Sequence, residues 1–243
     1  LDNRYGKAKN FKDFYIKSQL TNYEAIKPMF EAFQANRFSS TGVVHWMLNS
    51  AWPNFFWQLY DYNLYPTSAF YGTKKGAAPV HLIYDYGKKI IAINDTLKDI
   101  NNLKAEIKIY DFNSKVLLDE TIDYNIEENN SKTIYEIPEV NQISDIYFMS
   151  LKILGSSFNE IHRNFYWLSL EDDLLDHDNA TWYYTPQKKY ADFEDLFNLT
   201  KIKADVELKL IKSGNDKSVS IKVKNNSEDE QLLGAVDSYL SEL

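Results

Sequence analysis

The stretch Leu103-Lys104-Ala105-Glu106-Ile107-Lys108-Ile109 decides the fold class of this chain. Its apolar and charged side chains alternate strictly, which is typical of a β-strand with one buried face. Six more candidate strands lie on either side of it, separated by short turns. They are Val80–Tyr86, Lys89–Asp95, Lys115–Ile126, Lys132–Ile137, Asp145–Leu154 and Ile161–Ser169. Closely spaced short strands of this kind predict an all-β immunoglobulin-like sandwich over residues 79–170.

The sequence that follows this sandwich divides into two parts. Residues 171–197 are first acidic and then aromatic, and we expect a linker that packs on neighbouring surfaces. Residues 201–210 and 219–223 alternate again, which predicts the hairpin of another sheet. Two strands cannot bury a sandwich core, so we expect residues 198–243 to form a partial second β-sandwich.

The sequence before the sandwich begins with a predicted helix over Asn10–Ala35. Its apolar side chains recur at helical spacing, and Asn10 can cap the first turn. Pro28 lies inside this pattern. We therefore expect a kink one turn earlier or a break near Thr21, because proline cannot donate the helical hydrogen bond.

A short buried strand is predicted at Gly42–Leu48, and a second helix at Thr67–Gly76. Helix, strand, loop and helix follow one another as in an α/β barrel. Residues 1–78 alone contain far too few strands to close a barrel.

Composition excludes several classes of function. The chain has 243 residues, 44% of them hydrophobic, and a formal net charge of −8 without a basic block. A nucleic-acid partner is therefore not expected, because the cationic surface for a phosphate backbone is missing. There is no cysteine, which excludes disulfides and thiolate chemistry. No apolar run reaches the roughly 18 residues of a membrane span, so no membrane partner is expected.

The stretch Thr41–Pro66 contains three of the five tryptophans, Trp46, Trp52 and Trp57. Flat aromatic faces stack against sugar rings in some proteins and fill large cores in others. Trp46 lies near the C-terminal end of the predicted strand, where barrel enzymes place working residues, so both uses stay open for it. For Trp52 and Trp57 we favour packing.

The carboxylates give no convincing catalytic pair. Hydrolysis of a glycosidic bond needs two carboxyl groups on opposite sides of that bond. Glu24 and Glu31 lie on the predicted helix and have an ordinary explanation as helix-surface residues. Asp61 follows the aromatic stretch and is interpreted as a residue that ties down the loop.

No metal site or cofactor is expected. The four histidines are scattered, without the spacing of a zinc site, and no cysteine can complete one. The acidic run at residues 171–178 lacks the spacing and glycine of a calcium loop, so a solvated turn is favoured. The chain also lacks a glycine-rich nucleotide-binding fingerprint.

Ten short motifs carry a resemblance to a known family. They are Gln19–Leu20, Asn22–Glu24, Met29–Ala32, Thr41–Asn49, Ala51–Pro53, Trp57–Tyr62, Ala69–Gly72, Lys74–Lys75, Arg163–Leu168 and Thr181–Gln187. In these motifs the sequence resembles glycoside hydrolase family 2, and within it the exo-β-D-glucosaminidase branch. The long aromatic motif is the specific one. After residue 227 the sequence departs from the family, since Gln231–Leu243 does not resemble the family's next strand.

The resemblance implies a retaining enzyme with a catalytic (β/α)8 barrel followed by β-sandwiches. Residues 1–78 would then be the C-terminal end of that barrel. Both catalytic glutamates of the family lie on earlier barrel strands, so none is assigned to this chain. The chain starts at Leu1, which we interpret as a missing N-terminal part of the same enzyme. Family resemblance favours a secreted or periplasmic location.

By the same resemblance, Trp46 corresponds to an aromatic residue lining the subsite for the terminal sugar, and Asn49 and Trp52 are weaker substrate-binding candidates. The predicted function is that of a C-terminal fragment, inactive by itself, of an exo-β-glycosidase that removes terminal glucosamine from chitosan-like oligosaccharides. The alternative is a non-catalytic carbohydrate-binding or scaffold β-sandwich module.

Overall fold

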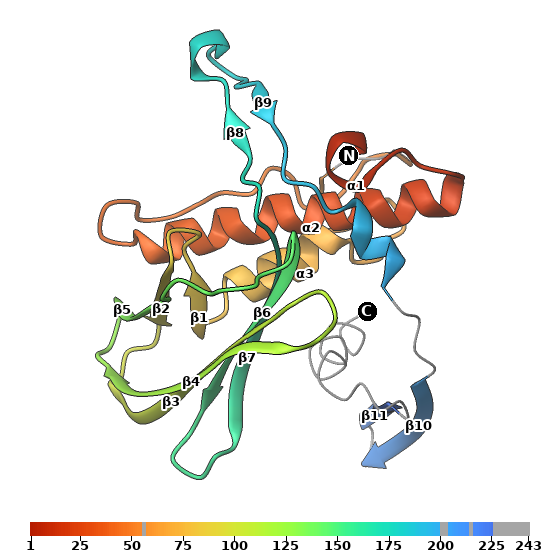
Figure 1. The fold of residues 1–243 in the computed structure, drawn as a ribbon. Coiled ribbons are helices and arrows are strands. Elements are labelled where there is room, and N and C mark those ends of the chain that lie inside the picture. The colour runs from red at the N-terminus through yellow and green to blue at the C-terminus, as the bar shows by residue number, and fades with distance from the viewer. Residues whose placement is uncertain (55–56, 200–203, 214–215, 226–243) are drawn as a thin grey trace.

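The computed structural model describes residues 1–54, 57–199, 204–213 and 216–225 (Figure 1). Strands are the main regular structure of the described chain, and three helices precede them. The helices are α1 (Asp2–Tyr5), α2 (Phe11–Ala35) and α3 (Ser68–Gly76). No helix in the described ranges is long and apolar enough to cross a membrane.

Seven strands form the predicted sandwich as two antiparallel sheets. One sheet has the order β1-β2-β5 and the other the order β4-β3-β6-β7. The strands are β1 (Val80–Tyr84), β2 (Lys89–Asn94), β3 (Ile100–Tyr110), β4 (Val116–Ile126), β5 (Asn130–Glu136), β6 (Ile146–Leu154) and β7 (Glu160–Ser169). The prediction of an immunoglobulin-like sandwich is confirmed.

Alternation along β3 places its two faces as expected. Leu103, Ala105, Ile107 and Ile109 are all buried in one core with residues of both sheets, such as Leu82. The intervening lysine and glutamate side chains stay partly exposed and pair across the sheet surface. Period-two patterning therefore sets the register of this central strand, because a slip by one residue would bury its charges.

Helix α2 is continuous over 25 residues, so the predicted break near Thr21 is wrong. The Thr21 hydroxyl donates to the Lys17 carbonyl at 2.8 Å, one turn back, instead of capping a new helix. Pro28 is accommodated inside the helix. The predicted cap is confirmed, since the Asn10 side chain accepts a hydrogen bond from the Asp13 amide at 3.0 Å.

The predicted buried strand at Gly42–Leu48 is wrong. These residues have no regular secondary structure, and Val44 is 89% exposed. A strand needs a neighbour for its amides and carbonyls. Among the described residues, the one backbone–backbone hydrogen bond of this segment runs from the Tyr60 amide to the Leu48 carbonyl, at 3.0 Å. The described residues do not show the barrel portion of the predicted fold class.

The two long helices pack against each other and against edge strand β7. Gly72 and Gly76 of α3 lie against the α2 backbone, where a Cβ at Gly76 would come within 2.7 Å of the Lys27 carbonyl oxygen. Lys27 donates to the Phe165 carbonyl at 2.9 Å, and Lys75 to the Arg163 carbonyl at 3.3 Å. The helices thus cover backbone acceptors that an edge strand otherwise leaves open.

The chain after the sandwich contains two hairpins. Strands β8 (Leu174–Leu175) and β9 (Gln187–Lys189) pair within the expected linker, together with the 3-10 helices η1 (His177–Asn179) and η2 (Glu194–Asn198). Strands β10 (Ala204–Ser213) and β11 (Asp216–Asn225) form the predicted hairpin of a further sheet. The departure expected over Gln231–Leu243 lies outside the described residues.

Candidate functional site

The aromatic segment, residues 41–66, is fixed at both ends. At its start, Arg37 donates to the carbonyls of Asn94 and Asn130, at 3.1 and 3.3 Å, and forms an ion pair with Asp95. At its end, Thr67 caps α3 by accepting a hydrogen bond from the Ala69 amide at 3.2 Å. The sandwich therefore holds the beginning of the aromatic segment, and the helix pair holds its end.

Side-chain hydrogen bonds stabilise the interior of the aromatic segment in place of a regular ladder. The buried Ser50 hydroxyl donates to Asn54 Oδ1 at 2.7 Å and also to Gln58. The Thr67 hydroxyl donates to the Gln58 carbonyl at 2.6 Å. Buried polar groups of an irregular loop need such partners, and here they give the loop a defined shape.

Trp46 is held at its backbone and exposed at its ring. The Trp57 indole N–H donates to the Trp46 carbonyl at 2.8 Å, and His45 Nε2 lies 3.1 Å from the Trp57 carbonyl. The Trp46 side chain is 74% exposed. Because the Trp46 backbone is held, its exposed ring can meet a ligand with little further loss of backbone freedom.

Asn49 and Trp52 lie in the same loop with different surroundings. Asn49 is half-buried, and its amide donates to the Ser50 carbonyl at 3.2 Å, while Trp52 is exposed. A cavity of about 550 Å³ lies between α2 and the aromatic segment, and Trp57 and Asn54 line it. The predicted residues Trp46, Asn49 and Trp52 do not line this cavity. The three predicted residues therefore lie in one loop, but they do not surround this cavity.

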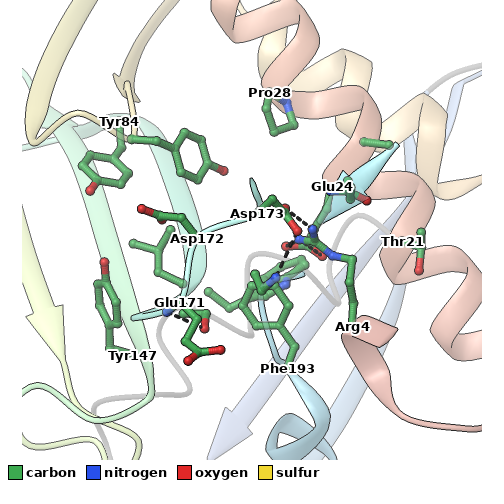
Figure 2. A pocket seen from close by; sticks show the side chains of 17 residues that line it. Arg4, Thr21, Glu24, Pro28, Tyr84, Tyr147, Glu171, Asp172, Asp173 and Phe193 are labelled. Carbon is green, nitrogen blue, oxygen red and sulfur yellow. Dashed lines mark hydrogen bonds and ion pairs between the residues drawn. The ribbon is translucent and has the colours of Figure 1, made fainter. Parts of the chain in front are cut away.

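A larger cavity, of about 680 Å³, lies where α2, the sandwich and the acidic residues 171–173 meet (Figure 2). Arg4 reaches between Glu24, at 3.4 Å, and Asp173. Tyr84, Tyr147 and Asp172 lie on the opposite side (Figure 2). The size suits a small ligand, but the two carboxylates nearest Arg4 are already paired with its guanidinium.

Glu24 has one property of a catalytic acid. Burial raises its pKa, against the opposing effects of Arg4 and of the Tyr5 hydroxyl. Burial also disfavours the charged Arg4, yet Glu24 and Asp173 together raise the pKa of its guanidinium. Because Tyr5 donates to Glu24 and Arg4 pairs with it, the carboxylate is occupied by its neighbours. We assign it to holding α1 on α2.

Glu31 is not the helix-surface residue that we expected. It is fully buried, and one of its oxygens accepts hydrogen bonds from Asn164 at 2.8 Å and from the Tyr166 hydroxyl at 2.9 Å. Lys27 lies 3.7 Å from the same oxygen and 3.5 Å from the Tyr166 ring centroid. The expectation failed because the partners come from β7, more than 130 residues away along the chain.

This group, which we call the interface network (Lys27, Glu31, Asn164 and Tyr166), is strongly desolvated. Burial lowers the pKa of Lys27 to about 8, although Glu31 partly offsets it. Burial raises the pKa of Glu31, against the effect of Lys27. The adjoining cavity measures only about 10 Å³, no more than one water molecule needs. The interface network therefore joins helix to sandwich and has no room for a sugar.

Within the described ranges, no group of three or more histidine, aspartate or glutamate side chains is placed to hold a metal ion. The acidic run has other partners instead. Asp173 pairs with Arg4, Glu171 with Lys189, and Asp176 with Lys188. Two features were not predicted from the sequence, because neither has a local signature. One is the hydrogen bond from the Trp57 indole to the Trp46 carbonyl, and the other is the set of contacts that Arg37 makes with the sandwich.

Comparisons with known proteins agree with this architecture. Residues 88–170 match the family described as "Mannosidase Ig/CBM-like domain". The chain is 35% identical to an exo-β-D-glucosaminidase of Arthroderma benhamiae, over 92% of this chain and 26% of that protein. It is 33% identical to the exo-β-D-glucosaminidase of Hypocrea jecorina, over 84% of this chain and 23% of that protein. This chain is a relative of the exo-β-D-glucosaminidases of glycoside hydrolase family 2.

The crystal structure of the Amycolatopsis orientalis exo-chitosanase CsxA extends the likeness to three dimensions. It matches 94% of this chain with a TM-score of 0.89 and 31% sequence identity, and this chain covers 28% of that protein. The predicted resemblance is confirmed. The chain spans about a quarter of the length of these relatives.

Proposed function

We propose that this chain is the C-terminal part of a retaining exo-β-glycosidase that removes terminal β-linked glucosamine from chitosan-like oligosaccharides. The observation that carries the proposal is the match of 94% of this chain, helices included, to the structure of the Amycolatopsis orientalis exo-chitosanase CsxA. In this view residues 1–78 belong to the catalytic barrel, residues 79–170 form the supporting sandwich, 171–197 form the linker and 198–243 part of a second sandwich.

The chain supplies substrate contacts and not the reacting carboxylates. A retaining glycosidase needs two carboxyl groups about 5–5.5 Å apart, one of them free to attack the sugar. Glu24 is occupied by Arg4 and Tyr5, and Glu31 is buried in the interface network. This agrees with the family resemblance, under which both catalytic glutamates lie on earlier barrel strands, and we propose that they lie outside this chain. Trp46 is our first candidate for a sugar-facing residue, with Asn49 and Trp52 behind it.

The test uses the purified 243-residue chain and the intact enzyme that contains it, side by side, on an aryl β-D-glucosaminide. We expect turnover by the intact enzyme and none by the chain. Comparable turnover by the chain alone would show that the carboxylates are present here. No turnover by the intact enzyme on glucosaminides would reject the substrate class.

The second candidate is a sandwich that binds glycans by itself. Of the aromatic side chains weighed for this role, Tyr84, Tyr110 and Phe148 are buried, which argues for support, whereas Tyr86 is exposed. Titrating the chain with glucosamine oligomers while following tyrosine fluorescence tests this alternative. A saturable change that survives substitution of the exposed tryptophans would favour a binding sandwich.

A further inference from the structure

Strands β8 and β9 belong to an arm, residues 171–189. Its base, residues 171–173, lies beside α2, and its two strands project away from the helices and the sandwich (Figure 1). Leu174 pairs with Lys189, and the Asp176 amide donates to the Pro186 carbonyl at 2.8 Å. At the end of the arm, the Thr181 amide donates to the Tyr184 carbonyl at 2.7 Å. The end is therefore a hydrogen-bonded turn with a defined shape.

This turn presents aromatic side chains that no core uses. Trp182 is 94% exposed and Tyr183 is 74% exposed, and their rings meet edge to face with centroids 5.0 Å apart. We call Trp182, Tyr183 and Tyr184 the aromatic tip. A cluster of exposed large aromatic side chains marks a place where something else binds.

The charge of the arm indicates the chemistry of that partner. Of the five carboxylates in the arm, Asp173 pairs with Arg4 and Glu171 with Lys189, which leaves Asp176 and Asp178 as the carboxylates nearest the tip. Close to the tip, Lys188 lies 3.2 Å from both Asp176 and Asp178, so one lysine serves two carboxylates. A cationic ligand is attracted to such a surface.

We propose that the aromatic tip is an accessory binding surface for a chain of β-linked amino sugars. Trp182 and Tyr183 stack on sugar rings, and Asp178 attracts a sugar ammonium group. This inference rests on the proposed function for the identity of the ligand, because an amino-sugar chain combines flat apolar ring faces with one positive charge per unit. It adds a second contact beyond the sugar held near Trp46.

The first test measures the substrate-length dependence of KM in the intact enzyme. We expect Trp182→Ala to raise KM for long glucosamine oligomers about fivefold to tenfold, as for a moderate hot-spot residue. KM for a short aryl β-D-glucosaminide should not change, since it cannot reach the tip. Phe158→Ala is the matched control, because Phe158 is also an exposed aromatic residue, in the turn between β6 and β7. It should change neither value.

Two results would overturn the inference. One is an unchanged KM for long oligomers in Trp182→Ala. The other is an equal loss on both substrates together with a lower Tm, which would show that the tip packs against the rest of the enzyme.

A second test separates this inference from the proposed function. The 243-residue chain is titrated with glucosamine hexamer while tryptophan fluorescence is followed. We expect saturable binding that weakens in Trp182→Ala and in Asp178→Asn, and that weakens with salt. If the chain binds the hexamer but the intact enzyme does not hydrolyse it, the binding surface at the aromatic tip is supported and the proposed glycosidase function is rejected. If the intact enzyme hydrolyses the hexamer but Trp182→Ala does not weaken binding, the proposed function is supported and the binding surface at the tip is rejected.

Discussion

The interface network and the aromatic segment both rely on polar side chains, but the network joins two parts of the chain, whereas the segment holds one loop in shape. In the network, a lysine, a glutamate, an asparagine and a tyrosine are removed from water. Asn164 and Tyr166 donate to one oxygen of Glu31, and Lys27 donates to the Phe165 carbonyl, so the bonds join two elements. In the aromatic segment, Ser50, Asn54 and Gln58 bond within one loop and leave the ring of Trp46 in solvent. The first arrangement fixes one part of the chain on another, and the second presents a side chain outward.

The difference predicts how each region responds to substitution. Removing one member of a buried charged network leaves its partners unpaired, which is expensive. Removing an exposed ring leaves the fold intact and acts only on what the ring touches. Changes in the free energy of unfolding should therefore be large at the helix–sandwich contact and small at Trp46, whereas effects on the substrate should follow the reverse order.

The largest expected effect is that of Glu31→Ala. It leaves Lys27 buried without its carboxylate and removes the acceptor of Asn164 and Tyr166, which should cost about 3–5 kcal/mol. Urea unfolding of the chain measures it. Glu171→Ala is the control, because its partner Lys189 is exposed, and it should change little.

A companion variant sharpens this prediction. The double substitution Lys27→Met with Glu31→Leu removes both charges together, and we expect it to be more stable than Glu31→Ala alone. If Glu31→Ala unfolds at the same urea concentration as the wild type, the network does not hold the helix on the sandwich.

The second effect is a pH dependence from His81 and His162, whose rings lie 5.8 Å apart. Burial lowers the pKa of His81 to about 4 and that of His162 to about 3, and the charge of His81 adds to the second shift. Lys75 and Lys27 face the pair, and Asp95 acts on His81. Because the folded pKa values lie below that of free histidine, the unfolded chain binds more protons below about pH 6.5.

Stability should therefore be complete above about pH 6.5 and fall as the pH drops toward 4. At pH 5 each histidine should contribute a loss of roughly 2 kcal/mol. Glu31 acts in the opposite direction, since burial raises its pKa. The contribution of His162 to the pH dependence is therefore measured by comparing the free energy of unfolding of the wild type with that of His162→Gln between pH 7.5 and pH 4.5. Parallel curves for the two proteins would contradict the assignment.

The third effect concerns the contact of α3 with α2. A Cβ at Gly76 would lie 2.7 Å from the Lys27 carbonyl oxygen and 2.9 Å from Phe30 Cβ, so Gly76→Ala should cost about 1–3 kcal/mol. At Gly72 the closest approach is 3.2 Å, and we expect a smaller loss. Thermal unfolding ranks the two variants. A more stable Gly76→Ala would mean that the helices separate easily, as helix propensity alone favours alanine.

Most of the sandwich could be predicted because its rule is local. The alternation along β3 buries Leu103, Ala105 and Ile107 and leaves Lys104 and Glu106 partly exposed, whatever the rest of the chain does. The Asn10 cap is local in the same sense. The interface network could not be predicted, since a glutamate on a helix has the same local pattern whether it faces water or Asn164.

The aromatic segment shows a second reason why a prediction from the sequence fails. Val43 and Val44 have the β-branched side chains of a strand, but a strand also needs a neighbour to accept and donate its hydrogen bonds. The described chain offers none there beyond the contact with Tyr60. The roles of Trp46, Asn49 and Trp52 came from family resemblance and stay predictions, because the loop geometry holds them in place without showing a ligand.

The smallest expected effect on stability is that of Trp46→Ala. The ring is mostly exposed, so the free energy of unfolding should change by less than about 0.5 kcal/mol. In the intact enzyme the same substitution should lower kcat/KM on an aryl β-D-glucosaminide by tenfold or more, because a loosened terminal sugar misplaces the reacting bond. Trp57→Phe should act in the same direction but more weakly, since it removes only the hydrogen bond to the Trp46 carbonyl. Trp46→Phe, which keeps an aromatic face, should recover part of the rate. An unchanged kcat/KM in Trp46→Ala would remove this residue from the sugar site, and a large loss of stability would mean that its ring is packed against another part of the enzyme.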